Sequence, residues 1–160
     1  MRGRTEQLAL SEAGRQFAER LLARHPEWEA FVAAYTPVNE NDRTEPGSLW
    51  LEVPSPHDPA APLWAIVQDG EALVGLGHRA AEQIFDWEPG ERDGAFESIL
   101  AFIDDVVRAK VVGAWERHRF LWKSWETCHF RRAADVSVGR YGVIRVSAWP
   151  TLPSHEGPGA

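Results

Sequence analysis

The sequence predicts an α+β fold, with N-terminal helices and a mostly antiparallel sheet of about six strands on which one central amphipathic helix packs. Three observations predict it. Apolar residues recur at helical spacing over residues 96–107, whereas over 49–53 and 144–148 aliphatic residues occupy every second position. The third is Asp69-Gly70, which separates two apolar runs as a tight hairpin turn does.

The N-terminal part is predicted to be helical. A short apolar stripe around Phe17 indicates a first helix. Pro26 suits the first position of a second helix, because its missing N–H needs no partner there. One face of that second helix is apolar, with residues at i, i+3, i+4 and i+7: Trp28, Phe31, Val32 and Tyr35. Residues 36–47 are predicted to form a polar loop.

Strands are predicted next. Residues 49–53 alternate, and residues 62–77 are typical of a hairpin with a type I′ turn at Asp69-Gly70. The segment 78–92 is ambiguous, since HRAAEQIF fits a short helix as well as a continuing strand.

The second half is predicted to hold the central helix and further strands. Asp93 is a suitable N-cap for the helix. Residues 111–130 suggest two strands that turn near His118-Arg119. Residues 135–149 suggest another hairpin around a glycine-flanked loop at 139–142. We expect one α+β domain over residues 1–150 and a disordered tail over 151–160.

Charge is distributed unevenly along the chain. Residues 36–105 hold 15 Asp/Glu against 3 Lys/Arg, a balance of −12, and residues 106–160 hold 9 Lys/Arg against 4 Asp/Glu, a balance of +5. Residues 1–35 are neutral, so the total is −7. Two interpretations stay open: the two blocks neutralise each other across one sheet, or the acidic block stands clear for a basic partner.

The composition also bounds the environment. The single cysteine, Cys128, allows no intrachain disulfide, and no apolar run resembles a signal peptide or reaches the length of a membrane span. We therefore expect a soluble, cytoplasmic protein that binds no membrane. The net negative charge argues against nucleic-acid binding, which depends on Lys and Arg at phosphates. The oligomeric state is left open.

No pattern identifies a catalytic, metal or cofactor site, and we predict none of the three. Cys128 and His129 are adjacent, so on a regular strand they point to opposite faces and cannot act together. His78 and Glu82 have ligand spacing only if helical, and they lack a third ligand. Phosphate-binding glycine motifs are absent from the sequence.

Part of the chain resembles small bacterial proteins of uncharacterised and toxin-immunity type. The shared features, within residues 49–119, are a W-x-E-V-x-S-P strand, an L-W strand leading to V-G-x-G, an F-D-W element, and the helix ILAFIDDVV: Trp50, Glu52, Val53, Ser55, Pro56, Leu63, Trp64, Val74, Gly75, Gly77, Phe85, Asp86 and Trp87. That family pattern often has a histidine pair before F-D, where this chain has Glu82-Gln83-Ile84. The resemblance implies no catalytic residue.

These observations favour a small acidic protein-binding domain of immunity or antitoxin type, which neutralises a basic partner such as a toxin by occupying its surface. The residues expected to bind the partner are acids around one aromatic anchor, which we expect to be exposed: Glu82, Asp86, Trp87, Glu88, Glu91 and Asp93. The alternative is a small-molecule-binding domain or enzyme with a tryptophan-lined pocket, because the chain has eight tryptophans. It predicts that His78, His118 or Cys128 converges with carboxylates. A third interpretation is a nucleic-acid-binding sheet whose C-terminal basic residues and tryptophans share one face.

Overall fold

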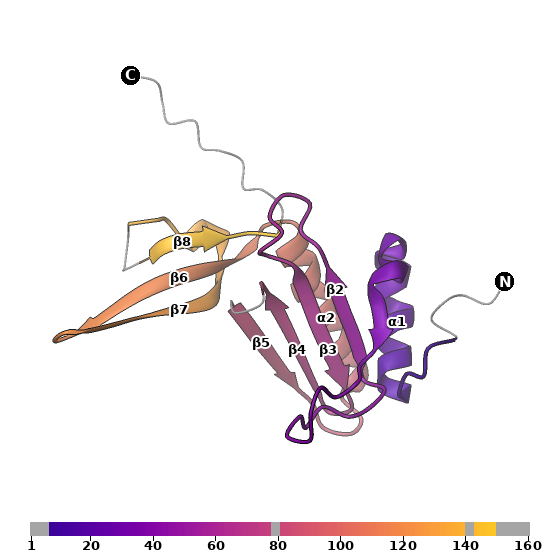
Figure 1. The fold of residues 1–160 in the computed structure, drawn as a ribbon. Helices are drawn as coiled ribbons and strands as arrows, with labels where there is room; N and C mark the ends of the chain where they lie inside the picture. Colours follow the sequence, from indigo (N-terminus) through magenta and orange to yellow (C-terminus); the bar gives the residue numbers. More distant parts are fainter. Residues whose placement is uncertain (1–6, 78–80, 140–142, 150–160) are drawn as a thin grey trace.

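The computed structural model describes residues 7–77, 81–139 and 143–149, and they form the predicted α+β fold (Figure 1). The strands within these ranges form two antiparallel sheets rather than one. The first has five strands in the order β1-β2-β3-β4-β5, and the second has three in the order β7-β6-β8. The elements are α1 (Glu12–Arg24), η2 (Pro26–Phe31), β1 (Val32–Ala34), β2 (Leu49–Val53), β3 (Leu63–Gln68), β4 (Glu71–Leu76), β5 (Ala81–Asp86), α2 (Arg92–Val107), β6 (Val111–Phe120), β7 (Lys123–Arg132), η3 (Ala133–Asp135) and β8 (Val143–Ser147).

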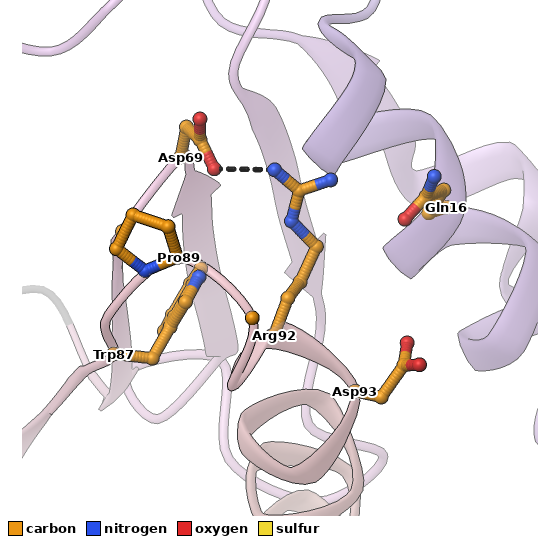
Figure 2. A pocket seen from close by; sticks show the side chains of 8 residues that line it. Gln16, Asp69, Trp87, Pro89, Arg92 and Asp93 are labelled. Carbon is orange, nitrogen blue, oxygen red and sulfur yellow. Dashed lines mark hydrogen bonds and ion pairs between the residues drawn. The ribbon is translucent and has the colours of Figure 1, made fainter.

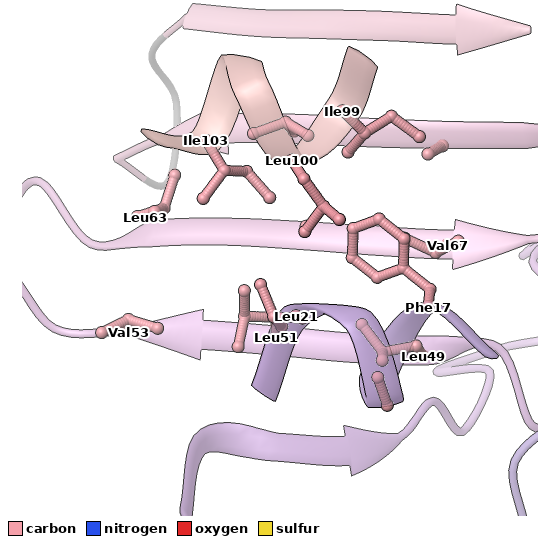
Figure 3. Close-up of a cluster of buried hydrophobic side chains, with 14 of the residues drawn as sticks. Phe17, Leu21, Leu49, Leu51, Val53, Leu63, Val67, Ile99, Leu100 and Ile103 are labelled. Atoms are coloured by element: carbon pink, nitrogen blue, oxygen red, sulfur yellow. The ribbon is translucent and has the colours of Figure 1, made fainter. Parts of the chain in front are cut away.

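The hydrophobic core lies between one face of the five-stranded sheet and the two α-helices (Figure 3). Every second residue of β2, β3 and β4 is buried there, which is the alternation that the sequence predicts. Phe17 of α1 and Phe96 of α2 meet edge to face, with ring centroids 5.2 Å apart. This contact joins the two helices above the sheet. The predicted apolar stripe of α2 is confirmed, because its members are buried: Phe96, Ile99, Leu100, Ile103 and Val106.

Neither α1 nor α2 covers the other face of the five-stranded sheet (Figure 1). Its outward residues form a cross-strand row in which each residue pairs with the next: Ala33, Trp50, Ile66, Leu73 and Ile84. The first four are partly buried, whereas Ile84 on the edge strand β5 is 55% exposed. The row makes this face apolar at its centre.

The second sheet continues into a projecting arm. Strands β6 and β7 pair along their full length, but β8 pairs with β6 only from Gly113 to Glu116. Residues 117–126 are therefore a two-stranded ribbon, here called the arm, which extends away from the five-stranded sheet (Figure 1). The base of this sheet contacts the core through Phe130, whose ring lies 4.9 Å from that of Phe102 on α2.

The predicted second helix is wrong beyond Phe31. Residues 26–31 form the 3₁₀ helix η2, and Val32 then begins strand β1, which pairs with β2. Trp28 and Val32 are both buried, so the apolar spacing reports burial correctly. The helix does not continue to Tyr35 because Val32, which is β-branched, occupies a buried strand position paired with β2.

The turns differ from prediction in position or type. The hairpin at Asp69-Gly70 is confirmed, but of its two turn residues only Gly70 has a positive φ, at 82°, so the turn is not type I′. The β6–β7 turn lies at Leu121-Trp122 and not near His118. Strand β8 pairs with β6, so the predicted hairpin over 135–149 is also wrong. In each case the sheet register decides where the chain reverses.

The ambiguous segment 78–92 resolves into strand β5 and a turn, with residues 78–80 outside the described ranges. Helix α2 begins at Arg92 with Glu91 as its N-cap, so Asp93 lies in the first turn and is not the cap. The predicted tail over 151–160 also lies outside the described residues.

Candidate functional site

The predicted partner-binding residues lie along strand β5 and in the connection from it to α2. Glu82 and Asp86 are on β5, while Trp87, Glu88 and Glu91 follow in the connection to α2, and Asp93 is in the first turn of that helix. A hollow of about 610 Å³ lies beside them (Figure 2). The residues that line it are Gln16, Asp69, Gly70, Trp87, Pro89, Gly90, Arg92 and Asp93. The Arg92 guanidinium crosses its mouth to Asp69, at 2.7 Å.

The expectation that Trp87 is exposed is wrong. Its side chain is only 9% exposed and packs edge to face on Phe96, with ring centroids 5.6 Å apart. Its backbone N–H donates to the carbonyl of Gly70 at 3.0 Å. The indole closes the end of the core between β5 and α2. Burial of its large apolar surface stabilises this end of the fold.

Asp93 also has a partner within the fold. Its carboxylate bonds to the guanidinium of Arg20 on α1. The same arginine approaches Glu97, and Arg24 pairs with Asp104 at 3.0 Å. Part of the acidic block is thus neutralised by the first helix. These pairs hold α1 against α2 across the top of the core.

The acidic and basic blocks hardly pair with each other. Of the ion pairs between described residues, only Lys110–Asp105, at 3.8 Å, joins them. The basic block instead pairs with its own acids, through Arg117–Glu126 at 2.9 Å and Arg131–Glu116 at 3.0 Å. Mutual neutralisation across one sheet is therefore not how the described residues arrange their charge.

Three carboxylates stand without an ion pair between described residues on the outer face of the sheet, close to Ile84. Glu82 and Asp86 flank Ile84 at two-residue spacing, so all three project from the same face. Glu71 lies directly opposite Asp86 on β4. Like charges at directly opposed positions destabilise a sheet. We call Glu71, Glu82, Ile84 and Asp86 the acidic edge.

Sequence reasoning identifies Glu82 and Asp86 but misses Glu71. The available signal is the Asp69-Gly70 turn. A two-residue hairpin turn places Glu71 opposite Gln68 and so fixes the register between β3 and β4. What the sequence lacks is the pairing of β4 with β5, which puts Glu71 opposite Asp86.

A second hollow, of about 590 Å³, opens on the outer face near the other edge of the sheet. We call it the aromatic groove, and it is lined by Ala34, Tyr35, Thr36, Val38, Trp50, Trp64 and Ile66. The Trp50 and Trp64 rings stack with centroids 6.0 Å apart. Trp64 lies flat over Gly75, and its Nε1–H donates to the Gly77 carbonyl at 3.0 Å.

The loop over residues 36–47 forms one side of this groove and is held in place by a hydrogen bond. The Tyr35 hydroxyl donates to the Asp42 carboxylate at 2.6 Å. This bond holds the pKa of Asp42 well below its usual range and raises the pKa of Tyr35. Backbone N–H groups of Val38 and Thr44 also donate to the same carboxylate. The acid therefore keeps its negative charge at the rim.

The groove brings tryptophans together, as the small-molecule alternative predicts, but neither hollow is lined by histidine or cysteine. His78 lies outside the described residues, and His118 lies on the arm, stacked on Trp125. Burial raises the pKa of the Cys128 thiol to about 11, so it is protonated at neutral pH and a poor nucleophile. Among the described residues, no group of three or more potential ligands is placed to hold a metal ion.

The arm carries both aromatic and basic residues, and Lys123 pairs with Phe120 next to the turn. His118 and Trp125 pair on one face, while Arg117 and Glu126 pair on the other. Trp115 lies under the Arg145 guanidinium, 4.4 Å from its ring centroid. Stacking of successive bases needs open aromatic faces beside cations, and two of the described arginines, Arg117 and Arg145, are already engaged with Glu126 and Trp115. The nucleic-acid interpretation stays a prediction.

No protein-family model, curated protein or solved structure matches this chain. The resemblance to immunity proteins thus stays a prediction. Neither α-helix in the described residues has the length and apolar character needed to cross a membrane.

Proposed function

We propose that this protein is a small protein-binding domain of immunity or antitoxin type that covers a basic surface of its partner. The observation that carries the proposal is the acidic edge, where two directly opposed carboxylates and a third acid surround the exposed Ile84. An apolar centre with a charged surround is the usual anatomy of a protein interface.

The cost of the Glu71–Asp86 juxtaposition supports this assignment. Opposed like charges reduce stability by a few tenths of a kcal/mol to about 1 kcal/mol. A lysine or arginine supplied by a partner removes that repulsion and adds attraction. The two carboxylates therefore have a lower electrostatic energy in the complex than in the free protein. Trp87 has no contact role in this proposal, because it belongs to the core.

Electrostatic attraction also sets the expected kinetics. Net charge of −7 and a local cluster of acids accelerate encounter with a basic protein, and salt weakens that acceleration. The tryptophan-lined-pocket alternative gives no such salt dependence. Salt response therefore separates the two functions.

The test uses two bait proteins that differ only in the acidic edge. Wild type and the Glu82→Gln/Asp86→Asn variant are used to capture partners at low and high salt, and association rates with each captured protein are then measured. We expect one basic protein to bind wild type and to associate roughly tenfold more slowly with the variant. Co-expression of wild type is expected to suppress that partner's activity.

A matched control removes two exposed acids elsewhere, as Glu40→Gln/Asp135→Asn. It changes net charge equally but leaves the acidic edge intact, so its association rate should stay near that of wild type. Equal slowing by both variants would show that only net charge matters. A partner that binds all three proteins alike would overturn the proposal.

A further inference from the structure

The tip of the arm is an apolar surface that the described residues leave exposed. Four large side chains lie at or next to the β6–β7 turn, and Trp122 is the most exposed at 85%: Phe120, Leu121, Trp122 and Trp125. A ribbon of two strands alone is marginally stable in water. A surface of this kind marks a site of interaction with another molecule.

The backbone conformation at the tip is unfavourable for the apolar side chain that it carries. Leu121 has a φ of 53°, in the left-handed region that favours glycine. A bulky residue in this conformation is strained by about 1 kcal/mol. Glycine would relieve the strain but would remove the apolar apex.

We propose that the arm docks into the aromatic groove of a second copy of this chain. The groove is a second apolar surface that none of the described residues covers. It lies at the opposite edge of the five-stranded sheet from β5, whereas the arm's own sheet contacts β5. Figure 1 shows the arm directed away from the five-stranded sheet, so the tip of the arm points away from the groove of its own chain. The volume of about 590 Å³ lies within the range of pockets that hold drug-sized ligands, enough for the side chains of the tip.

The charges of the two surfaces are complementary. The arm holds Arg117, Arg119 and Lys123 against Glu126, a balance of +2. The loop over residues 36–47, which lines the groove through Thr36 and Val38, holds three acids against Arg43, a balance of −2. This local complementarity favours a second copy of the chain as the occupant, because the acidic loop lies beside the groove into which the basic arm would dock.

Reciprocal exchange of arms brings the contact to the size of a specific interface. An aromatic side chain buries about 150–250 Å², so docking one tip removes roughly 500 Å² from that arm. Exchange between two copies therefore removes on the order of 1,000 Å² from the two arms together, near the lower limit for specific interfaces.

The test is the mass of the purified chain in solution between about 1 and 200 µM, by light scattering and sedimentation. Wild type should associate with rising concentration, and less so in high salt. Leu121→Gly should weaken association at least about tenfold while leaving the fold intact, because glycine relieves the strained φ. Trp122→Ser should weaken it at least about 30-fold.

The groove is tested with Val38→Lys, which places a cation where the basic arm should dock. Val38 is 79% exposed, so this change does not disturb the core. Val138→Lys is the matched control, since Val138 is 63% exposed in a loop outside both surfaces. We expect monomers from Val38→Lys and wild-type behaviour from Val138→Lys.

Mixing supplies the decisive result. Leu121→Gly retains an intact groove and Val38→Lys retains an intact arm, so an equimolar mixture should associate more strongly than either variant does alone. A wild-type chain that stays monomeric at the highest concentration would overturn the proposal. So would equal association by Val38→Lys and wild type, or an arm that binds lipid vesicles while the chain stays monomeric.

Discussion

The position of Trp64 depends on the absence of a side chain at residue 75, and Gly75→Ala tests this dependence. A Cβ added to Gly75 would lie 2.1 Å from both Cε2 and Cζ2 of Trp64. Gly75 does not have a positive φ, so alanine is compatible with its backbone. The three nearest atoms all belong to the indole of Trp64, which forms one wall of the aromatic groove.

The magnitude follows from three contributions. The indole must retreat from 2.1 Å to at least 3.4 Å, and such overpacking costs about 1–3 kcal/mol. Displacement also breaks the Nε1–H bond to the Gly77 carbonyl, at about 1 kcal/mol. Replacing glycine in a strand recovers about 0.5–1 kcal/mol of backbone entropy. The net expectation is a loss of about 1–3 kcal/mol in the free energy of unfolding.

The assay is urea unfolding followed by circular dichroism, because tryptophan fluorescence itself will change. Gly94→Ala is the control: nothing lies within 4 Å of its added Cβ, and in helix α2 it should raise stability by about 0.5–1 kcal/mol. In a Trp64→Leu background, Gly75→Ala should cost less than in wild type. A Gly75→Ala protein as stable as wild type, or a cost that is unchanged in the Trp64→Leu background, would refute the reasoning.

Three further predictions concern the core, the thiol and the rim of the groove. Phe96→Ala should lower the free energy of unfolding by about 3–5 kcal/mol, measured in urea, because its ring is fully buried. Cys128 should react with iodoacetamide about a hundredfold more slowly at pH 8 in the folded than in the unfolded chain, since burial raises its pKa from 9.0 to about 11; equal rates would contradict this. Asp42→Asn should reduce stability at pH 7 and progressively less as the pH falls below about 4, because the pKa of Asp42 is lowered by the Tyr35 hydroxyl and its contribution is lost on protonation. Unfolding of wild type and variant from pH 7 to pH 3 measures that difference, and a gap that does not narrow would contradict the assignment.

The elements with strong local patterns were predictable. Helix α2 presents the predicted apolar stripe, β2 alternates as predicted, and the reversal at Asp69-Gly70 joins β3 to β4. Each depends on the repeat of side chains along one element, which is written directly in the chain. The failures occur where pairing with a distant strand competes with local spacing, as at Val32, which enters β1.

The candidate site was predictable only in part. Acids on β5 are visible in the sequence, and alternation implies that Glu82 and Asp86 share a face if the segment is a strand. Whether Trp87 is exposed is not local information, since the ring is buried only because α2 packs back on it. The opposition of Glu71 and Asp86 likewise requires the register between β4 and β5.

The uneven charge and the periodic apolar pattern are properties of the chain, and they predicted an α+β domain with an acidic and a basic block. Which charges meet was decided by the fold, because ion pairs form between elements far apart in sequence, such as Arg20 and Asp93. The projecting arm is likewise a consequence of tertiary structure. Strand β8 pairs with β6 only up to Glu116, so beyond that point β6 and β7 continue as a two-stranded ribbon, and its aromatic tip stands exposed.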